Sequence, residues 1–401
     1  MLIKIDDTVI QQIKSKLHSL NITSPEVKAL NNIATAIKEG FHIISASLDT
    51  LEFLYKFDLL EHDSKRMYFS VFSKFTYLSS YEQFCEDCIL IKDSSCIFNR
   101  TNTVTNKTVF EIPIDYFSHL VSILPTILLS EDMSDCEFYE KIAKKYITEN
   151  HHKVNAHLKF DLRSGGGSGS YKTYQYEINK GHLVLAISDS DKTYPTDKIG
   201  STLLMLRRIY NSHRHNKITE LLELDVREKE NLIPPSLYLL CHNVYSKEFL
   251  LKLCKIENSH IHQEKLRYID LKDGITAKSL KTNIERKSYL EGFFYDASDL
   301  IACTFEEIDS RDDEFLIMQG IGGNLDKFST DVLDDGLEKK LAQKKGVSLH
   351  TPIPEYVIKE LEGNILKKQK LFDELPGYLK ADWEKLSKKI ISWGCANEPV
   401  A

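Results

Sequence analysis

The sequence predicts an α/β protein with a central parallel sheet flanked by mainly helical N- and C-terminal regions. Between about residues 123 and 235, short and nearly all-apolar runs alternate with segments of helical periodicity, which is typical of βαβ units. Outside this stretch, apolar residues recur mostly at helical spacing. The chain has 401 residues, so at roughly 150 residues per domain we expect more than one domain. We expect a helical region with a few strands at 1–120, the sheet domain at 121–235 and a helical region at 236–401.

The elements of the central region follow from their periodicity. Four runs are apolar or alternating and predict strands: Thr126–Ser130, Val154–Leu162, His182–Ser188 and Thr219–Leu224. Two segments with one apolar face predict helices: Glu137–Tyr146 and Ile199–Tyr210. A glycine-rich loop, Ser164–Ser170, follows the second predicted strand.

The flanking regions have weaker patterns. The first 80 residues predict helices, one opening at Ser24-Pro25 and ending near Gly40, and a second covering Ile43–Leu54. Residues 80–112 are more typical of strands. Near the other end, Leu266–Leu271 predicts one further strand in an otherwise helical region.

Bulk composition excludes some classes of protein. The formal net charge of -7 argues against binding nucleic acid over the whole surface, although basic clusters such as Arg214–Lys217 leave a local site open. No apolar stretch reaches the roughly 20 residues that span a membrane, and the N-terminal residues do not have the pattern of a secretory signal. We therefore expect a cytoplasmic protein with reduced cysteines. Cys85, Cys88 and Cys96 are either the beginning of a zinc site or buried thiols.

Acidic residues follow two of the predicted strands. Glu131 comes directly after Thr126–Ser130, with Asp135 in the next turn, and Asp189 and Asp191 come directly after His182–Ser188. The carboxyl ends of parallel strands form the ligand-binding edge of open α/β sheets. Two carboxylates one residue apart repel each other, so they favour a bound cation, and Mg²⁺ is the cation that prefers such oxygen ligands.

These motifs together resemble the TOPRIM domain of topoisomerases, primases and nucleases. The family pattern is a strand ending in Glu, often as Glu-Gly-x-x-Asp, followed by a later strand ending in Asp-x-Asp. Residues 131–135 match the first motif, with Asp132 in place of the usual glycine, and residues 189–191 match the second. The resemblance covers about residues 124–235 and implies a Rossmann-like parallel sheet. It also implies that Glu131, Asp189 and Asp191 bind Mg²⁺ or Mn²⁺. Asp135 would serve a second metal, as in the overcoming-lysogenization-defect nucleases.

Further candidates surround this core. Glu228 and Glu230 lie in a stretch similar to one found in TOPRIM-like nucleases, where they would be a metal ligand or its support, but acidic residues also favour a helix N-terminus. Lys192 is either a phosphate contact or a solvated turn residue, and Lys272 is a more distant candidate for stabilising transition-state charge. The loop Gly165–Gly169 does not have the Walker spacing and is either a loop beside the site or a plain connector.

The resemblance implies a Mg²⁺-dependent endonuclease that hydrolyses DNA or RNA, as the toxic effector of a bacterial antiphage defence system. Because the chain has no ATPase motif, a sensor ATPase or a reverse transcriptase with its DNA product is the expected partner, and homo-oligomerisation stays open. The flanks supply neither a topoisomerase tyrosine domain nor a clear primase region. The alternative is a non-catalytic, TOPRIM-like subunit that binds nucleic acid or regulates a defence complex.

Overall fold

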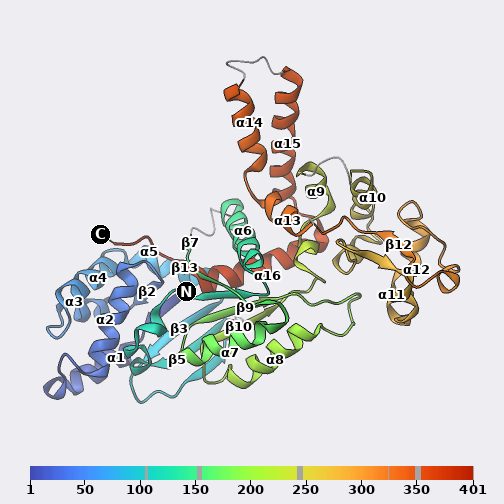
Figure 1. The fold of residues 1–401 in the computed structure, drawn as a ribbon. Helices are drawn as coiled ribbons and strands as arrows, with labels where there is room; N and C mark the ends of the chain where they lie inside the picture. The colour runs from blue at the N-terminus through green and yellow to red at the C-terminus, as the bar shows by residue number, and fades with distance from the viewer. Residues whose placement is uncertain (104–106, 151–155, 242–246, 324, 348–353, 401) are drawn as a thin grey trace. The chain divides into compact units, whose positions relative to one another are not determined.

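The computed structural model describes residues 1–103, 107–150, 156–241, 247–323, 325–347 and 354–400 (Figure 1). The chain forms two compact units. The first unit comprises residues 1–188, 201–222 and 385–401, and the second comprises residues 189–200 and 223–384. The protein is α/β, as predicted, and the first unit contains two mainly parallel sheets.

The first sheet of the first unit has five strands in the order β2-β1-β3-β5-β4. β1, β2, β3 and β5 are parallel, and β4 pairs antiparallel with β5. The bounds are β1 (Leu2–Ile5), β2 (Ile43–Ala46), β3 (Asp87–Lys92), β4 (Asn99–Asn102) and β5 (Thr108–Pro113).

The second sheet of the first unit has four strands in the order β10-β9-β6-β8. Both β8 and β9 pair parallel with β6, and Ile127 faces Asp161 on one side and Val184 on the other. The bounds are β6 (Ile127–Ser130), β8 (Asp161–Ser164), β9 (Val184–Ser188) and β10 (Thr219–Glu223). Every residue of β6 and β9 is buried, which explains their nearly continuous apolar sequence.

Helices connect these strands, and a short sheet of β13 (Cys395–Ala396) and β7 (His157–Leu158) completes the first unit. Its α-helices are α1 (Asp7–Ser15), α2 (Pro25–Lys38), α3 (Leu48–Lys56), α4 (His62–Ser73), α5 (Phe75–Ser79), α6 (Met133–Glu149), α7 (Ser170–Lys180) and α8 (Ser201–His213). Its 3-10 helices are η1 (Leu17–Ser19), η2 (Ser80–Gln83), η3 (Ile114–Ser118), η4 (Leu120–Ile123) and η5 (Gly167–Gly169). α6 contacts β6 and β8, while α7 contacts β9.

The second unit is mainly helical. Its only sheet among the described residues pairs β11 (Gly274–Thr276) with β12 (Leu316–Gln319). Its α-helices are α9 (Pro235–Cys241), α10 (Lys247–Glu257), α11 (Ala277–Lys281), α12 (Ile284–Asp296), α13 (Leu325–Leu333), α14 (Gly336–Val347) and α15 (Glu355–Asp373). Its 3-10 helices are η6 (Lys229–Leu232), η8 (Gln263–Arg267) and η9 (Ile308–Ser310). α16 (Gly377–Gly394) begins among the residues of the second unit and ends among those of the first.

Three predictions of secondary structure are wrong. Val154–Leu162 is not a single strand: residues 154–155 lie outside the described residues, and the rest is divided between β7 (His157–Leu158) and the start of β8 (Asp161–Ser164), which belong to different sheets. The first 80 residues are not all helical, because Leu2–Ile5 and Ile43–Ala46 are strands; both are buried and too short to reveal a periodicity. Leu266–Leu271 is not a strand. The side chain of Asn231 donates hydrogen bonds to the carbonyl oxygens of Leu266 and Ile269, both at 2.8 Å, and so replaces the partner that a sheet would provide.

The two units differ from the three regions expected from the sequence, because residues 1–120 share one unit with most of the expected sheet domain. Arg100 of β4 forms an ion pair with Glu220 of β10 at 2.6 Å, although the two residues belong to different sheets. Glu220 also lies 3.9 Å from Lys389 near the C-terminus, and Lys389 pairs with the buried Asp87 at 2.7 Å. These ion pairs connect segments that are far apart in the sequence.

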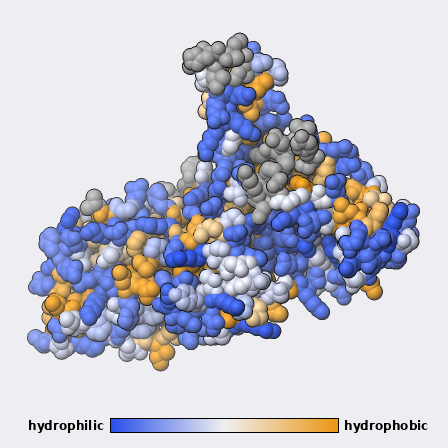
Figure 2. All heavy atoms as spheres, in the orientation of Figure 1, coloured by the Kyte–Doolittle hydropathy of each residue, from blue (hydrophilic) through white to orange (hydrophobic). Residues whose placement is uncertain are grey.

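Hydrophilic residues cover most of the face drawn in Figure 2, with hydrophobic residues in scattered patches. Among the described residues, none of the helices combines the length and the apolar character needed to cross a membrane.

Candidate functional site

Glu131 is the first residue after β6, and Asp189 is the first residue after β9. The two strands are parallel neighbours, with Leu129 opposite Ala186, so their carboxyl ends lie at the same edge of the sheet. The Ser130 hydroxyl donates to the carbonyl oxygen of Ile187 at 2.9 Å, which joins the two strand ends. Ligands of open α/β sheets bind at this edge.

The glycine-rich loop after β8 lies against the backbone of Glu131. The N–H groups of Gly166 and Gly167 both donate to the carbonyl oxygen of Glu131, each at 3.2 Å. A Cβ atom on Gly165 would lie 2.7 Å from the carbonyl oxygen of Ser130, so a larger residue does not fit there. A Cβ atom on Gly167 would lie 3.8 Å from Oε1 of Glu131. The loop therefore belongs to the surroundings of the Glu131 carboxylate.

Asp132 and Asp135 form the N-terminal cap of α6. The N–H of Asp132 donates to Oδ2 of Asp135 at 2.9 Å, and Asp132 accepts a hydrogen bond from the N–H of Met133 at 2.5 Å. This capping box gives Asp135 a structural role. A metal ion at Asp135 would share that oxygen with the cap or use the other one.

Hydrogen bonds fix the backbone of the Asp189-Ser190-Asp191 segment within the second unit. Ser190 is buried, and its hydroxyl donates to the carbonyl oxygen of Val226 at 2.6 Å. The N–H groups of Ser190 and Asp191 both donate to the carbonyl oxygen of Arg227, at 3.1 and 2.9 Å. The segment after β9 is thus held against the residues that precede Glu228.

Asp191 has a left-handed backbone conformation with a φ of 56°, which no other non-glycine residue in the described part of the chain has. Such strain occurs most often at functional positions. Its carboxylate packs against Gly200, where a Cβ atom would lie 1.8 Å from Oδ2 of Asp191. Only glycine leaves room for this carboxylate.

Glu228 joins Asp191 in an acidic cluster of the second unit. Burial raises the pKa of Glu228; the negative charges of Asp270 and Asp191 also raise it, whereas Arg227 and Lys272 lower it. A cation bound among these carboxylates would relieve their repulsion. The structure also distinguishes Glu228 from Glu230. The side chain of Glu228 is 22% exposed, whereas Glu230 is only 5% exposed within η6.

Arginine side chains lie beside this cluster. Arg227 forms ion pairs with Asp270 at 2.8 Å and with Glu228 at 3.1 Å. Arg286 is only 6% exposed, and its buried Nε has no hydrogen-bond partner among the described residues. Burial lowers the pKa of Arg286 to about 10, and the nearby positive charge of Arg227 lowers it too, while the carboxylates of Asp270 and Asp197 oppose this. A buried cation is costly when its hydrogen-bond donors are not all used, so an anion from outside the chain would stabilise it.

The sequence did not reveal Arg286. It is the third residue of α12, in a stretch that resembles an ordinary solvated helix face. Its burial follows from long-range packing, and a single sequence contains no signal for it. Lys192 and Lys272, which the sequence did suggest, both belong to the second unit: Lys192 follows Asp191, and Lys272 comes two residues after Asp270. The N–H of Lys192 donates to the Ser190 hydroxyl at 3.3 Å, and that of Lys272 donates to Asp270 at 3.1 Å.

The carboxylates fit a hard cation by their chemistry, since Glu131, Asp189, Asp191 and Glu228 offer only oxygen ligands. The glycines beside Glu131 and Asp191 also leave space around two of these groups. In the described ranges, however, no three His, Cys, Asp or Glu side chains are close enough together to hold a metal ion. The same finding applies to the zinc interpretation of Cys85, Cys88 and Cys96. The thiol of Cys85 instead lies 3.7 Å from that of Cys395.

Comparisons of the chain with protein-family models, with curated proteins and with solved structures find no match.

Proposed function

We propose that the chain is a Mg²⁺- or Mn²⁺-dependent endonuclease and that its β10-β9-β6-β8 sheet is a TOPRIM domain. One observation carries the proposal: β6 and β9 are parallel neighbours, and the chain continues from them into Glu131 and Asp189. The sequence motifs therefore follow adjacent strands of one sheet, as the TOPRIM resemblance requires.

Glu131, Asp189 and Asp191 would hold the metal ion, with Asp135 and Glu228 as further ligands. When bound, the ion acts as a Lewis acid and lowers the pKa of the water molecule that it binds. We propose that metal binding brings these carboxylates together. The buried Glu230 supports η6 and is the weaker of the two candidate glutamates.

The cationic residues of the second unit would bind and orient the phosphodiester. Guanidinium groups match the geometry of phosphate oxygens, and Arg286 has donors that no described residue uses. Arg286 would therefore position the scissile phosphate. Lys192 and Lys272 would add positive charge where negative charge develops in the transition state.

The substrate is either DNA or RNA. We propose that the enzyme is the effector of an antiphage defence system and that a sensor ATPase, or a reverse transcriptase with its DNA product, controls it. The alternative is a non-catalytic subunit that binds nucleic acid or regulates a complex. The structural use of Asp135 in a cap and of Glu228 in an ion pair with Arg227 favours that alternative.

A cleavage assay tests the proposal. Purified protein is incubated with plasmid DNA and with tRNA in Mg²⁺, Mn²⁺ or EDTA, with and without co-expressed neighbouring gene products. Cleavage should require the metal, and Glu131→Gln should reduce it by at least about 100-fold, as expected for the loss of a group that stabilises the transition state. Glu137→Gln, an exposed glutamate on α6, is the matched control and should cleave normally. Cleavage of neither substrate under any condition would favour the non-catalytic alternative.

A further inference from the structure

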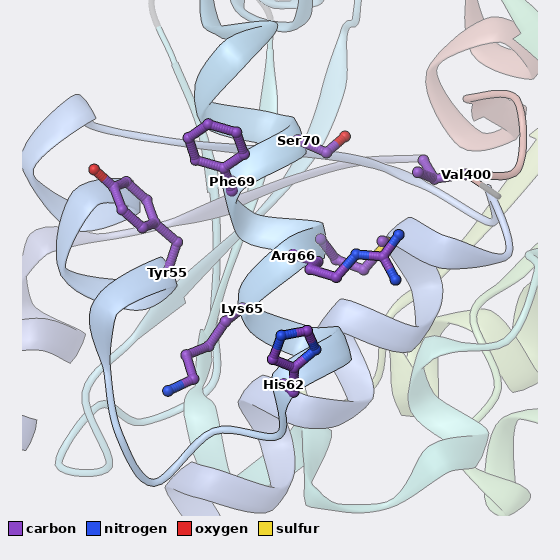
Figure 3. Close-up of a pocket in the computed structure, with 8 residues that line it drawn as sticks. Tyr55, His62, Lys65, Arg66, Phe69, Ser70 and Val400 are labelled. Atoms are coloured by element: carbon purple, nitrogen blue, oxygen red, sulfur yellow. The ribbon is translucent and has the colours of Figure 1, made fainter.

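A second candidate site lies in the first unit, away from the residues discussed above. It is a pocket of about 520 Å³ lined by residues of α3 and α4 and by Val400 near the C-terminus (Figure 3). The N–H of Val400 donates to the carbonyl oxygen of Lys38 at 2.9 Å, which holds the C-terminal segment beside these helices. Pockets of about 300–1,000 Å³ are typical of small-molecule sites.

Aromatic rings form one part of the lining. The rings of Tyr55 and Phe69 lie next to one another in Figure 3, with centroids 5.4 Å apart and planes at 82°. Phe72 packs against both rings and so supports them from α4. Phe69 nevertheless stays 53% exposed, which is unusual for a residue with so many aromatic neighbours. One ring face is thus available to a planar ligand.

Basic residues of α4 form another part of the lining: His62, Lys65 and Arg66, with no acidic residue among the residues that line the pocket. Their ion pairs are long and exposed. Lys65 lies 3.5 Å from Asp58, and Arg66 lies 3.8 Å from Asp63. Exposed pairs of this kind contribute only about 0–1 kcal/mol, so a phosphate can replace the carboxylates at little cost.

Asp63 is also shared. Besides Arg66, it lies 3.3 Å from Lys38, so one carboxylate serves two cations. The three cations Lys38, Lys65 and Arg66 therefore share two carboxylates, Asp58 and Asp63.

We propose that this pocket binds a nucleotide unit, with the base stacked on Phe69 beside the Tyr55 ring and the phosphate bound by Lys65 and Arg66, whose long side chains would rotate toward it. A purely apolar ligand would make no use of the basic side chains, and a bare anion would make no use of the exposed ring. A nucleotide matches both parts of the lining, because its base can stack on the exposed ring and its phosphate can pair with the basic side chains. The site is independent of the proposed nuclease site and stands whether or not the chain cleaves nucleic acid.

Calorimetric titration in EDTA, which prevents any metal-dependent cleavage, tests this proposal with the full chain. The probes are AMP, ribose 5-phosphate, which has no base, and adenosine, which has no phosphate. AMP should bind more tightly than either fragment. Phe69→Ala and Arg66→Gln should each weaken AMP binding about fivefold or more, because stacking on one ring contributes about 1–3 kcal/mol per base.

Matched variants outside the pocket separate this site from general effects. Tyr176→Ala removes an aromatic ring on α7 that is 55% exposed, and Lys28→Gln removes an exposed cation of α2. Both should bind AMP like the wild type. Since Arg66 is exposed, Arg66→Gln should also keep the wild-type melting temperature.

A second titration with a ten-residue oligothymidylate identifies the source of the nucleotide. Binding of AMP but not of the oligonucleotide points to a free nucleotide as the ligand. Tighter binding of the oligonucleotide points to single-stranded nucleic acid. Either result supports the site if Phe69→Ala weakens the binding that is observed. The proposal is overturned if neither probe binds at millimolar concentration, if ribose 5-phosphate binds as well as AMP, or if the pocket variants bind like the wild type.

Discussion

The N–H of Asp191 donates a hydrogen bond to the carbonyl oxygen of Arg227 at 2.9 Å. Asp191 comes from the segment after β9, and Arg227 directly precedes Glu228 in the segment after β10. The bond therefore couples two segments that each contribute a candidate metal ligand. The Ser190 hydroxyl donates a hydrogen bond to the carbonyl oxygen of Val226 and strengthens the same connection.

Variants of Asp191 should separate its charge from its backbone conformation. Asp191→Asn should keep the stability of the wild type because asparagine tolerates a left-handed φ. Asp191→Ala should be about 1 kcal/mol less stable than Asp191→Asn, because alanine tolerates this conformation poorly. Both variants should lose nuclease activity. Urea denaturation and cleavage assays measure the two effects, and equal stability of the two variants would contradict the structural assignment.

Gly200→Ala should disturb the Asp191 carboxylate without removing any acidic group. The new Cβ atom would lie 1.8 Å from Oδ2, so the carboxylate must move. We expect a loss of activity of about 10- to 100-fold, as for other changes that misplace a metal ligand. Gly363→Ala in α15 is the control. A Cβ atom there meets nothing within 4 Å, so it should raise stability by up to about 1 kcal/mol and leave activity unchanged. Normal activity of Gly200→Ala would argue against a role for Asp191.

Arg286→Gln should change stability and activity in opposite directions. Removing a buried charge whose desolvation outweighs its attraction to Asp270 and Asp197 should stabilise the protein by on the order of 1–3 kcal/mol. The loss of a phosphate contact should at the same time weaken binding of an oligonucleotide. Lys278→Gln, an exposed lysine of the same unit, should change neither quantity. Thermal unfolding and fluorescence anisotropy measure the two effects; a destabilised variant with normal binding would make Arg286 a structural residue.

The raised pKa of Glu228 predicts that both the stability of the protein and its affinity for a metal ion depend on pH. An acid whose pKa is higher in the folded protein contributes stability below its unfolded pKa, near 4.3, and loses it as the pH rises through the folded value. The stability of the wild type relative to Glu228→Gln should therefore fall as the pH rises above about 4.3. Affinity for Mn²⁺ should rise over the same range, because the ligand must lose its proton. A stability difference that does not vary with pH would contradict the shift.

The buried His42 predicts the opposite trend for the stability of the first unit. Burial lowers its pKa well below the usual value, with the positive charges of the Met1 amino group and Lys159 acting in the same direction. Nε2 lies 3.0 Å from the carbonyl oxygen of Leu124, which fits a neutral ring that donates from Nε2. Stability should be fully present above about pH 6.5 and fall as the pH decreases through the unfolded pKa.

His42→Gln should reduce this pH dependence. The variant should be less stable than the wild type at pH 7.5, because the hydrogen bond to Leu124 is weakened, and the gap should narrow toward pH 5. Urea denaturation at four pH values measures it, and parallel curves for the two proteins would count against a buried neutral histidine.

Three strands of the second sheet were predictable because every residue of β6 and β9, and all but the last residue of β10, is buried. Thr126–Ser130, His182–Ser188 and Thr219–Leu224 correspond to β6, β9 and β10, and the predicted helices correspond to α6 and α8. β1 and β2 were missed because a buried strand of four residues has no period that distinguishes it from the end of a helix.

The candidate site was only partly predictable. Residues that follow a strand directly, such as Glu131 and Asp189, are found from the order of the elements. Tertiary packing decides three other features of the site: the different exposure of Glu228 and Glu230, the contact between the Asp191 carboxylate and Gly200, and the burial of Arg286. Periodicity and composition contain no information on such contacts.

The most direct test of the proposed metal site is a crystal of the protein soaked with Mn²⁺ and measured for anomalous scattering. We expect a peak coordinated by Glu131 and Asp189, with Asp191 beside it, and loss of the peak in Glu131→Gln. The absence of a peak at these residues at 10 mM Mn²⁺, a concentration roughly tenfold above the millimolar affinities of weak metal sites, would contradict the proposed metal site.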